Sequence, residues 1–223
     1  MKNKSYIGIS FIILIFGIWA VNEIGLRLKK SDLAEIGPAP SFELTNQNGK
    51  AITDKDYKGK VYVVEFFFST CPTICPVMNQ NMLKLQKQFY GNPKFGIASI
   101  TINPDYDTPQ VLKEHAEQLG VKHYNWHFLT GDRDYIYQLA EKGFNLYAGQ
   151  NENAPGGFEH SGYLALVDKN GTIRSRYDEN GNPIIYYSGL NYLDKEGLEE
   201  DLEGTYTPQV DALIEDIEKL LEE

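Results

Sequence analysis

Residues 61–76 read VYVVEFFFSTCPTICP, and this stretch decides the fold. Its first part, Val61–Phe68, is a run of β-branched and aromatic residues, which is typical of a buried central strand. Cys71 and Cys75 follow directly, and Pro76 fits the first turn of a helix because proline has no backbone N–H to donate. The stretch therefore predicts a cysteine loop between a strand and a helix, where open α/β sheets carry their functional sites.

Strand and helix signals alternate on both sides of this stretch, which predicts an α/β fold. Thr108 and Pro109 are typical of a helix start, and Gly120 of its end. Asn-Gly pairs predict the turns of two hairpins. The expected strands are 95–102 and 126–129; the expected helices are 78–91, 109–119, 133–142 and one from Pro208; the expected hairpins are 42–53 and 163–177.

Length and charge limit the possible functions. The 223 residues are enough for one domain with a core and a short appendage. The formal net charge of −10 repels phosphate backbones, so we expect no nucleic-acid partner. With only two cysteines, the chain does not fit a disulfide-stabilised scaffold.

The N-terminal segment is apolar. Ser5–Val21 contains no charged residue, which predicts a transmembrane helix near the short limit for a bilayer span. If Ala20 were one of the two small residues that signal peptidase needs, Ile18 would stand at the other position, so we expect an uncut signal anchor rather than a cleaved signal peptide. The predicted organisation is an anchor over 1–21, a linker over 22–36 and a domain over 37–223.

The cysteine pair has three interpretations. Free cysteines are often core residues, but a strand-to-helix loop is a poor place for core thiols. The helix N-terminus favours thiolate over thiol, which suits either a redox-active disulfide or a soft-metal site for Cu(I) or zinc. The spacing of Cys71 and Cys75 alone does not choose between these two.

Four blocks of sequence carry a family resemblance. They are FFFSTCPTICPVMN, SITINPDYDTPQVLKEHAEQLGV, WHFLTGDRDYIYQLAEKGF and FEHSGYLALVDKNGTI, in this order. Between about Gly37 and Tyr177 the chain resembles the SCO/SenC family of copper-binding proteins, which assist cytochrome c oxidase assembly. The resemblance implies a thioredoxin-like fold, a membrane tether and copper bound by Cys71, Cys75 and His160.

The resemblance also implies a function and a location. We expect a copper metallochaperone, not an enzyme, that assists assembly of the copper centre of cytochrome c oxidase. Its expected partners are the copper-receiving subunit of the oxidase and other copper chaperones. The expected location is the bacterial inner membrane, crossed once, with the domain facing the periplasm or the cell exterior. The chain departs from the family's common acidic residue at Asn103 and from its common Asp at Glu159.

The alternative function is a membrane-tethered thiol–disulfide oxidoreductase that reduces cysteines of the oxidase subunit. Such reductases normally have two residues between their cysteines, a Trp before the first cysteine and a Pro facing the pair. Here three residues separate the cysteines, Thr70 precedes Cys71, and the chain reads EHSGY near the expected Pro. These features favour metal binding.

Other polar residues receive structural interpretations. The loop Pro155–Gly157 before His160 gives that histidine freedom to reach the sulfurs. We expect His115 to be solvated on its helix, and His123 and His127 not to form a second site. Asp105 and Asp107 are predicted to form the turn before Thr108, and the run 194–203 to be a solvated acidic surface.

Overall fold

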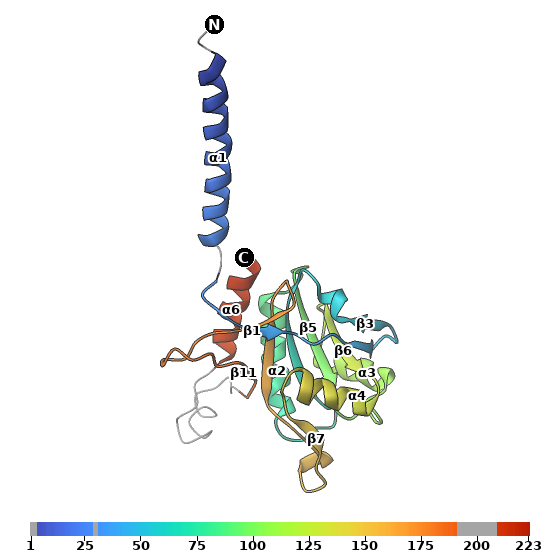
Figure 1. Cartoon of the computed structure of the whole chain (residues 1–223). Helices are drawn as coiled ribbons and strands as arrows, with labels where there is room; N and C mark the ends of the chain where they lie inside the picture. The colour runs from blue at the N-terminus through green and yellow to red at the C-terminus, as the bar shows by residue number, and fades with distance from the viewer. Residues whose placement is uncertain (1–3, 29–30, 191–208) are drawn as a thin grey trace. The chain divides into compact units, whose positions relative to one another are not determined.

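The structure, a computed structural model, describes residues 4–28, 31–190 and 209–223 (Figure 1). It divides into two compact units, residues 1–32 with 222–223, and Leu33–Leu221. The acidic run 194–203 and the predicted helix start at Pro208 lie outside the described residues.

Helix α1 (Lys4–Leu28) contains the apolar run Ser5–Val21. Across the described residues, the structure has no helix with both the length and the apolar character needed to cross a membrane. The sequence-based anchor is therefore not confirmed and stays a prediction. Both ends of the segment 22–36 have regular structure, since α1 ends at Leu28 and the first strand begins at Ala34.

The second unit is built on a nine-stranded sheet. Its strand order is β1-β10-β9-β4-β5-β6-β2-β3, and β11 pairs with β9. Strands β4, β5 and β6 are parallel, whereas the other pairings are antiparallel. The strands are β1 (Ala34–Pro38), β2 (Glu43–Asn46), β3 (Ala51–Thr53), β4 (Val61–Phe67), β5 (Phe95–Thr101), β6 (Trp126–Thr130), β9 (Tyr163–Val167), β10 (Thr172–Ser175) and β11 (Tyr187–Ser188).

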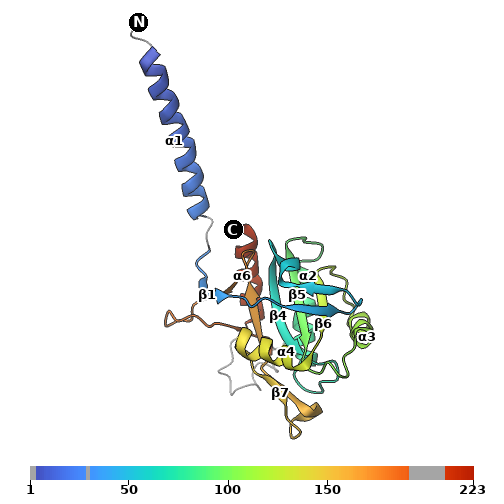
Figure 2. The same cartoon turned by 45° about the vertical axis from the view of Figure 1, so that its right-hand side comes forward.

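Helices connect and cover these strands (Figure 2). Thr108 caps α3 by accepting a hydrogen bond from Val111 N at 3.4 Å, and Gly120 ends it with φ 78°. Both ends follow the signals in the sequence. The helices are α2 (Cys75–Gln88), α3 (Pro109–Leu119), α4 (Arg133–Gln138), which continues as a π-helical turn (Leu139–Gly143), and α6 (Val210–Glu222).

The core lies around β4 and β5. Every residue of these two strands is buried, as in central strands of a sheet that is covered on both faces. Met78, Met82 and Leu85 of α2 are fully buried against this core. The predicted strand, cysteine loop and helix over 61–91 are confirmed, and they place the loop at the carboxyl end of β4.

The sequence does not predict three strand pairings. Strand β1 pairs with β10, so the compact unit begins at Leu33, earlier than the predicted boundary at Gly37. Strand β11 pairs antiparallel with β9. Strands β7 (Ala148–Gln150) and β8 (Phe158–His160) form a separate two-stranded sheet. All these strands are short or contain Gly and Pro, and their partners are set by tertiary contacts.

Candidate metal centre

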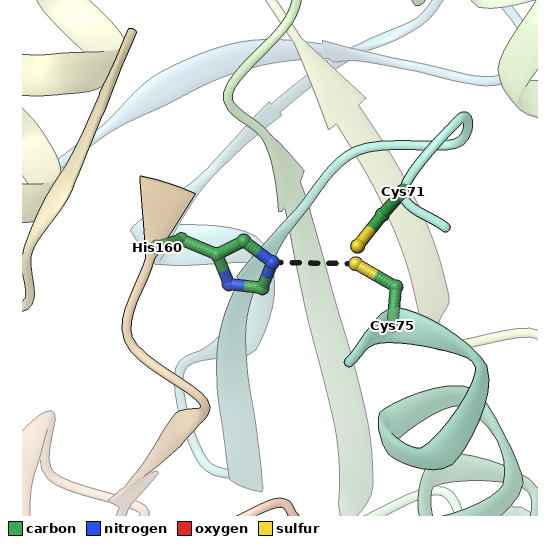
Figure 3. Close-up of side chains that lie close together, drawn as sticks. All are labelled: Cys71, Cys75 and His160. Atoms are coloured by element: carbon green, nitrogen blue, oxygen red, sulfur yellow. Dashed lines mark hydrogen bonds between the residues drawn. The ribbon is translucent and has the colours of Figure 1, made fainter. Parts of the chain in front are cut away.

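Three predicted ligands meet at one end of the sheet. Cys71 comes from the loop after β4, Cys75 is the first residue of α2, and His160 is the last residue of β8. One donor atom from each, the two Sγ atoms and an imidazole nitrogen, lie within 4.8 Å of one another. Figure 3 shows the two sulfurs facing each other and the imidazole directed at Cys75.

The cysteine loop is short and partly exposed. The N–H of Cys71 donates to Phe68 O at 3.2 Å, which closes a turn directly after β4. Pro76 occupies the first turn of α2, as expected. Cys75, the first residue of the helix, is buried, whereas Cys71 in the loop is half-buried.

Phe68 joins the cysteine loop to the hairpin that carries His160. Its ring centroid lies 5.3 Å from that of Phe158 and 5.9 Å from that of His160. At Gly156 (φ 84°) an added Cβ would lie 2.9 Å from the Phe68 ring and 3.1 Å from Pro72. The hairpin tip therefore packs closely against Phe68 and Pro72 only because residue 156 has no side chain.

The imidazole of His160 has a defined orientation. Its Nδ1 lies 3.2 Å from Ser161 O, and because a carbonyl oxygen only accepts, Nδ1 carries the proton. In the neutral ring, Nε2 then has a free lone pair, and it lies 3.3 Å from Cys75 Sγ. Backbone hydrogen bonding of one nitrogen is a common way to aim the other at a metal.

The two thiols do not titrate independently. A hydrogen bond from Cys75 lowers the pKa of Cys71 well below that of a free thiol, although partial burial opposes the shift. The same hydrogen bond, together with burial, raises the pKa of Cys75. The first thiolate therefore forms easily and the second proton is retained by the pair.

This donor set suits a soft metal ion. Thiolates favour Cu(I) and zinc, and neutral imidazole is compatible with both. The two sulfurs and an imidazole nitrogen lie within 4.8 Å of one another, and Figure 3 shows the three side chains converging. The same two thiols are also close enough for redox chemistry, so the geometry alone leaves metal binding and disulfide formation open.

The sequence predicts a solvated His115, and this is wrong. The imidazole is half-buried, with ring centroids 5.7 Å from those of Phe67 and Phe128. Burial lowers its pKa. The reason is that α3 packs over strands β4 and β6, and their aromatic residues are distant in sequence from the charged neighbours of His115.

The other two histidines lie apart from the three ligands and make their own contacts. His123 is buried and its Nε2 donates to Phe89 O at 3.2 Å. His127 lies beside Tyr57, and burial lowers its pKa to about 4. In the described part of the chain, only Cys71, Cys75 and His160 form a group with metal-ligand spacing.

The aspartates before α3 form the predicted turn. The N–H groups of Tyr106 and Asp107 both donate to Asn103 O, at 3.1 and 2.9 Å. Asp105 pairs with Arg133. Asp107 instead turns inward and is fully buried, which the sequence does not predict.

Glu65 is another buried carboxyl group near the site. It lies on β4, its Oε1 accepts a hydrogen bond from Ser99 Oγ at 2.5 Å, and Trp126 Nε1 donates to the same hydroxyl at 2.9 Å. Burial raises the pKa of Glu65 to about 7, although the Ser99 hydrogen bond and the charge of His160 oppose the shift. The available signal was one acidic residue inside the apolar run 61–68.

The site and the fold have counterparts in known proteins. A family model described as SCO1/SenC matches residues 31–193. The SCO1 protein homolog of Bacillus subtilis is 32% identical over 164 residues, which cover 70% of this chain and 83% of the relative.

Two solved structures extend the comparison. BsSco, described as a member of the Sco family of cytochrome c oxidase assembly proteins with a disulfide switch, matches with a TM-score of 0.65 and 27% identity, over 86% of this chain and 96% of its own. Copper-bound ScoI of Bradyrhizobium japonicum matches with a TM-score of 0.55 and 26% identity, over 63% and 89%. These neighbours confirm the expected thioredoxin-like α/β fold.

Proposed function

The chain belongs to the SCO1/SenC family, and we propose that it is a copper metallochaperone that binds copper through Cys71, Cys75 and His160. In this role it assists assembly of the copper centre of cytochrome c oxidase. Its partner is the copper-receiving subunit of the oxidase, and other copper chaperones supply the metal. The family resemblance expected from the sequence motifs is confirmed.

One observation carries this proposal: two sulfurs and an oriented imidazole nitrogen within 4.8 Å of one another. The chemistry of the donors fits copper, because thiolates are soft ligands and imidazole suits both oxidation states. Copper is the cargo here, and the chain's own residues hold and release it. Cys75 and His160 are buried, whereas half-buried Cys71 is the ligand that a partner reaches first.

The proposal is tested by adding Cu(I) to the reduced chain and by deleting the gene in the parent organism. We expect one copper per chain, and in the deletion strain a loss of oxidase activity that added copper partly restores. A reduced chain that binds no copper contradicts the proposal. Unchanged oxidase activity under copper limitation points to a different client.

A second candidate function rests on the thiol pair. Two coupled thiols, one with a lowered pKa, suit thiol–disulfide exchange with cysteines of the same oxidase subunit. Copper binding and the disulfide exclude each other, since a disulfide removes both sulfur ligands. An oxidase defect that a small thiol reductant rescues, and copper does not, favours this function.

The proposal includes a location. We place the domain outside the cytoplasm and assign the tether to the apolar run Ser5–Val21. The support is the uncharged sequence of this run, which lies within helix α1. An oxidase subunit that receives copper outside the cytoplasm requires its chaperone on the same side of the membrane.

A further inference from the structure

Asp107 contacts the cysteine loop from another part of the fold. It lies in the connection between β5 and α3, directly before the helix cap Thr108, and it is fully buried. Its carboxyl group accepts three hydrogen bonds, from the Ser69 N–H at 3.1 Å, from the Ser69 hydroxyl and from the Thr101 hydroxyl. Two of the three donors belong to a single residue of the loop.

Ser69 connects Asp107 to the turn that leads into Cys71. It lies inside the turn that the Cys71 N–H closes on Phe68 O at 3.2 Å. Thr70 and Thr73 are exposed, so packing restrains them little, whereas Pro72 is exposed but lies beside Gly156 of the hairpin tip. The position of Cys71 Sγ therefore depends on how firmly Ser69 is held at the end of β4.

We propose that Asp107 is a positioning residue that fixes Cys71 relative to Cys75 and His160 by binding both polar groups of Ser69. The proposal rests on the proposed function for its copper readout, although not for its redox readout. Asp107 touches none of the three ligands and acts through the loop.

The two cysteines differ in what fixes their positions, which explains why Asp107 acts on Cys71. Cys75 is the first residue of α2 and is buried in the core, so the helix sets its position. Cys71 is half-buried and packs against the core, but it lies in the loop before α2, so no helix fixes its backbone. Buried hydrogen bonds to a carboxyl group hold their donors firmly, because a donor left without an acceptor there is costly.

Thr101 offers a matched control on the same carboxyl group. Its hydroxyl donates to Asp107 from β5, and it also accepts from Asn103 N at 3.0 Å. Thr101→Val removes these contacts and leaves both Ser69 hydrogen bonds in place. It therefore perturbs Asp107 and the local fold without releasing the cysteine loop.

The test compares wild type, Asp107→Ala, Asp107→Asn, Ser69→Ala and Thr101→Val in the full chain. The first readout is Cu(I) affinity by competition with a chelator. The second, without metal, is the equilibrium constant of the Cys71–Cys75 disulfide with glutathione. Circular dichroism and thermal melts establish that each variant is folded.

We expect Asp107→Ala to weaken Cu(I) binding by about tenfold or more. It also makes the disulfide several-fold easier to reduce, because a loose loop lowers the effective concentration of one thiol near the other. Asp107→Asn retains an acceptor oxygen for the Ser69 N–H and recovers part of both losses. Ser69→Ala shifts both constants in the same direction by less, and Thr101→Val leaves them unchanged.

Folded Asp107→Ala protein with wild-type values in both readouts overturns the proposal. If Asp107→Ala does not fold, folded Ser69→Ala decides, and unchanged constants there overturn it equally. Equal effects in Asp107→Ala and Thr101→Val also overturn it, because they indicate general destabilisation. If wild type binds no Cu(I) but the disulfide constant shifts in Asp107→Ala, the proposed function fails and the positioning role stands.

Discussion

The Sγ atom of Cys75 lies 3.3 Å from the Nε2 atom of His160, a residue 85 positions later in the chain. The two belong to different elements, helix α2 and strand β8. The proton on Nδ1, held by Ser161 O, leaves the Nε2 lone pair free to face the sulfur. For a metal ion to replace this contact, the Cys75 thiol must lose its proton. The imidazole ring can keep its orientation, because Nε2 already faces the sulfur.

The first prediction concerns the ligands. We expect Cys71→Ala or Cys75→Ala to remove the thiolate-to-copper charge-transfer absorption of the Cu(II) form. His160→Ala weakens binding and leaves two-sulfur Cu(I) binding, because thiolates are the stronger soft ligands. His127→Gln is the control, since that residue lies beside Tyr57 and belongs to no metal-ligand group. An unchanged Cu(II) spectrum in His160→Ala contradicts the assignment.

The second prediction concerns Glu65 and pH. Burial raises its folded-state pKa from an ordinary 4.5 to about 7. The folded chain therefore binds the Glu65 proton more tightly than the unfolded chain does. This tighter binding contributes its full stability below about pH 4.5, and the contribution is lost as pH rises through about 7. Glu65→Gln removes this decline.

The measurement for Glu65 is the difference in the free energy of unfolding between wild type and Glu65→Gln at pH 5 and pH 8. Taking the difference cancels the titration of groups common to both proteins. We expect the free energy of unfolding of Glu65→Gln, relative to that of wild type, to be higher at pH 8 than at pH 5. A difference that is constant with pH shows that Glu65 has an ordinary pKa.

The third prediction concerns the hairpin tip. Gly156→Ala places a Cβ against Phe68 and Pro72 in a left-handed backbone conformation. Gly157 has nearly the same φ, 82° against 84°, but open space around it. Gly157→Ala therefore has only the backbone cost of about 1–2 kcal/mol. We expect Gly156→Ala to be less stable and to bind copper more weakly, as measured by melts and chelator competition; equal effects would contradict this contact.

The fourth prediction concerns the attachment of α6. Fully buried Asp216 accepts hydrogen bonds from Arg176 Nε at 2.7 Å and from the Tyr187 hydroxyl at 2.8 Å. Asp216→Ala leaves these donors without their acceptor, and we expect a loss of about 2–3 kcal/mol in the free energy of unfolding. Exposed Glu215 also pairs with Arg176, and Glu215→Ala should cost about 0.5 kcal/mol or less in urea denaturation. Similar losses in both variants would refute a special role for Asp216.

The fifth prediction concerns the tether. We expect the full chain to fractionate with membranes, and protease added outside spheroplasts to digest the domain from Leu33 onward. Release of a shortened soluble form would indicate cleavage of the apolar segment. Complete protection of the domain in intact spheroplasts would contradict its proposed location.

Local signals predicted much of the fold. Thr108, Pro109 and Gly120 mark the two ends of α3 because capping depends on residues next to the helix terminus. Strand β4 and the start of α2 follow from the apolar run and Pro76. Strands β1 and β8 were missed because a few residues form them only when distant partners are in place.

The site residues also divide into those that local sequence predicts and those that depend on tertiary contacts. Cys71 and Cys75 could be recognised as a pair from their spacing, whereas His160 depended on the family resemblance. The burial of His115 and Asp107 is not predictable from local sequence, because each is covered or bound by residues from other elements, whereas Glu65 lies inside the apolar run 61–68 and only its partner Ser99 is unpredicted. Local sequence specifies the elements, and tertiary packing decides which polar side chains are enclosed.

The separate sheet of β7 and β8 has a consequence for the diversification and redesign of the protein. Because neither strand pairs with the nine-stranded sheet, insertions or deletions between Gln150 and Phe158 change no register in that sheet. The imidazole is thus carried on a separate two-stranded module, whose sequence is restricted mainly where Gly156 and Phe158 pack against Phe68 beside the cysteine loop. Transplanting the hairpin between homologues is therefore a practical route to exchanging surface chemistry around the site without rebuilding the core.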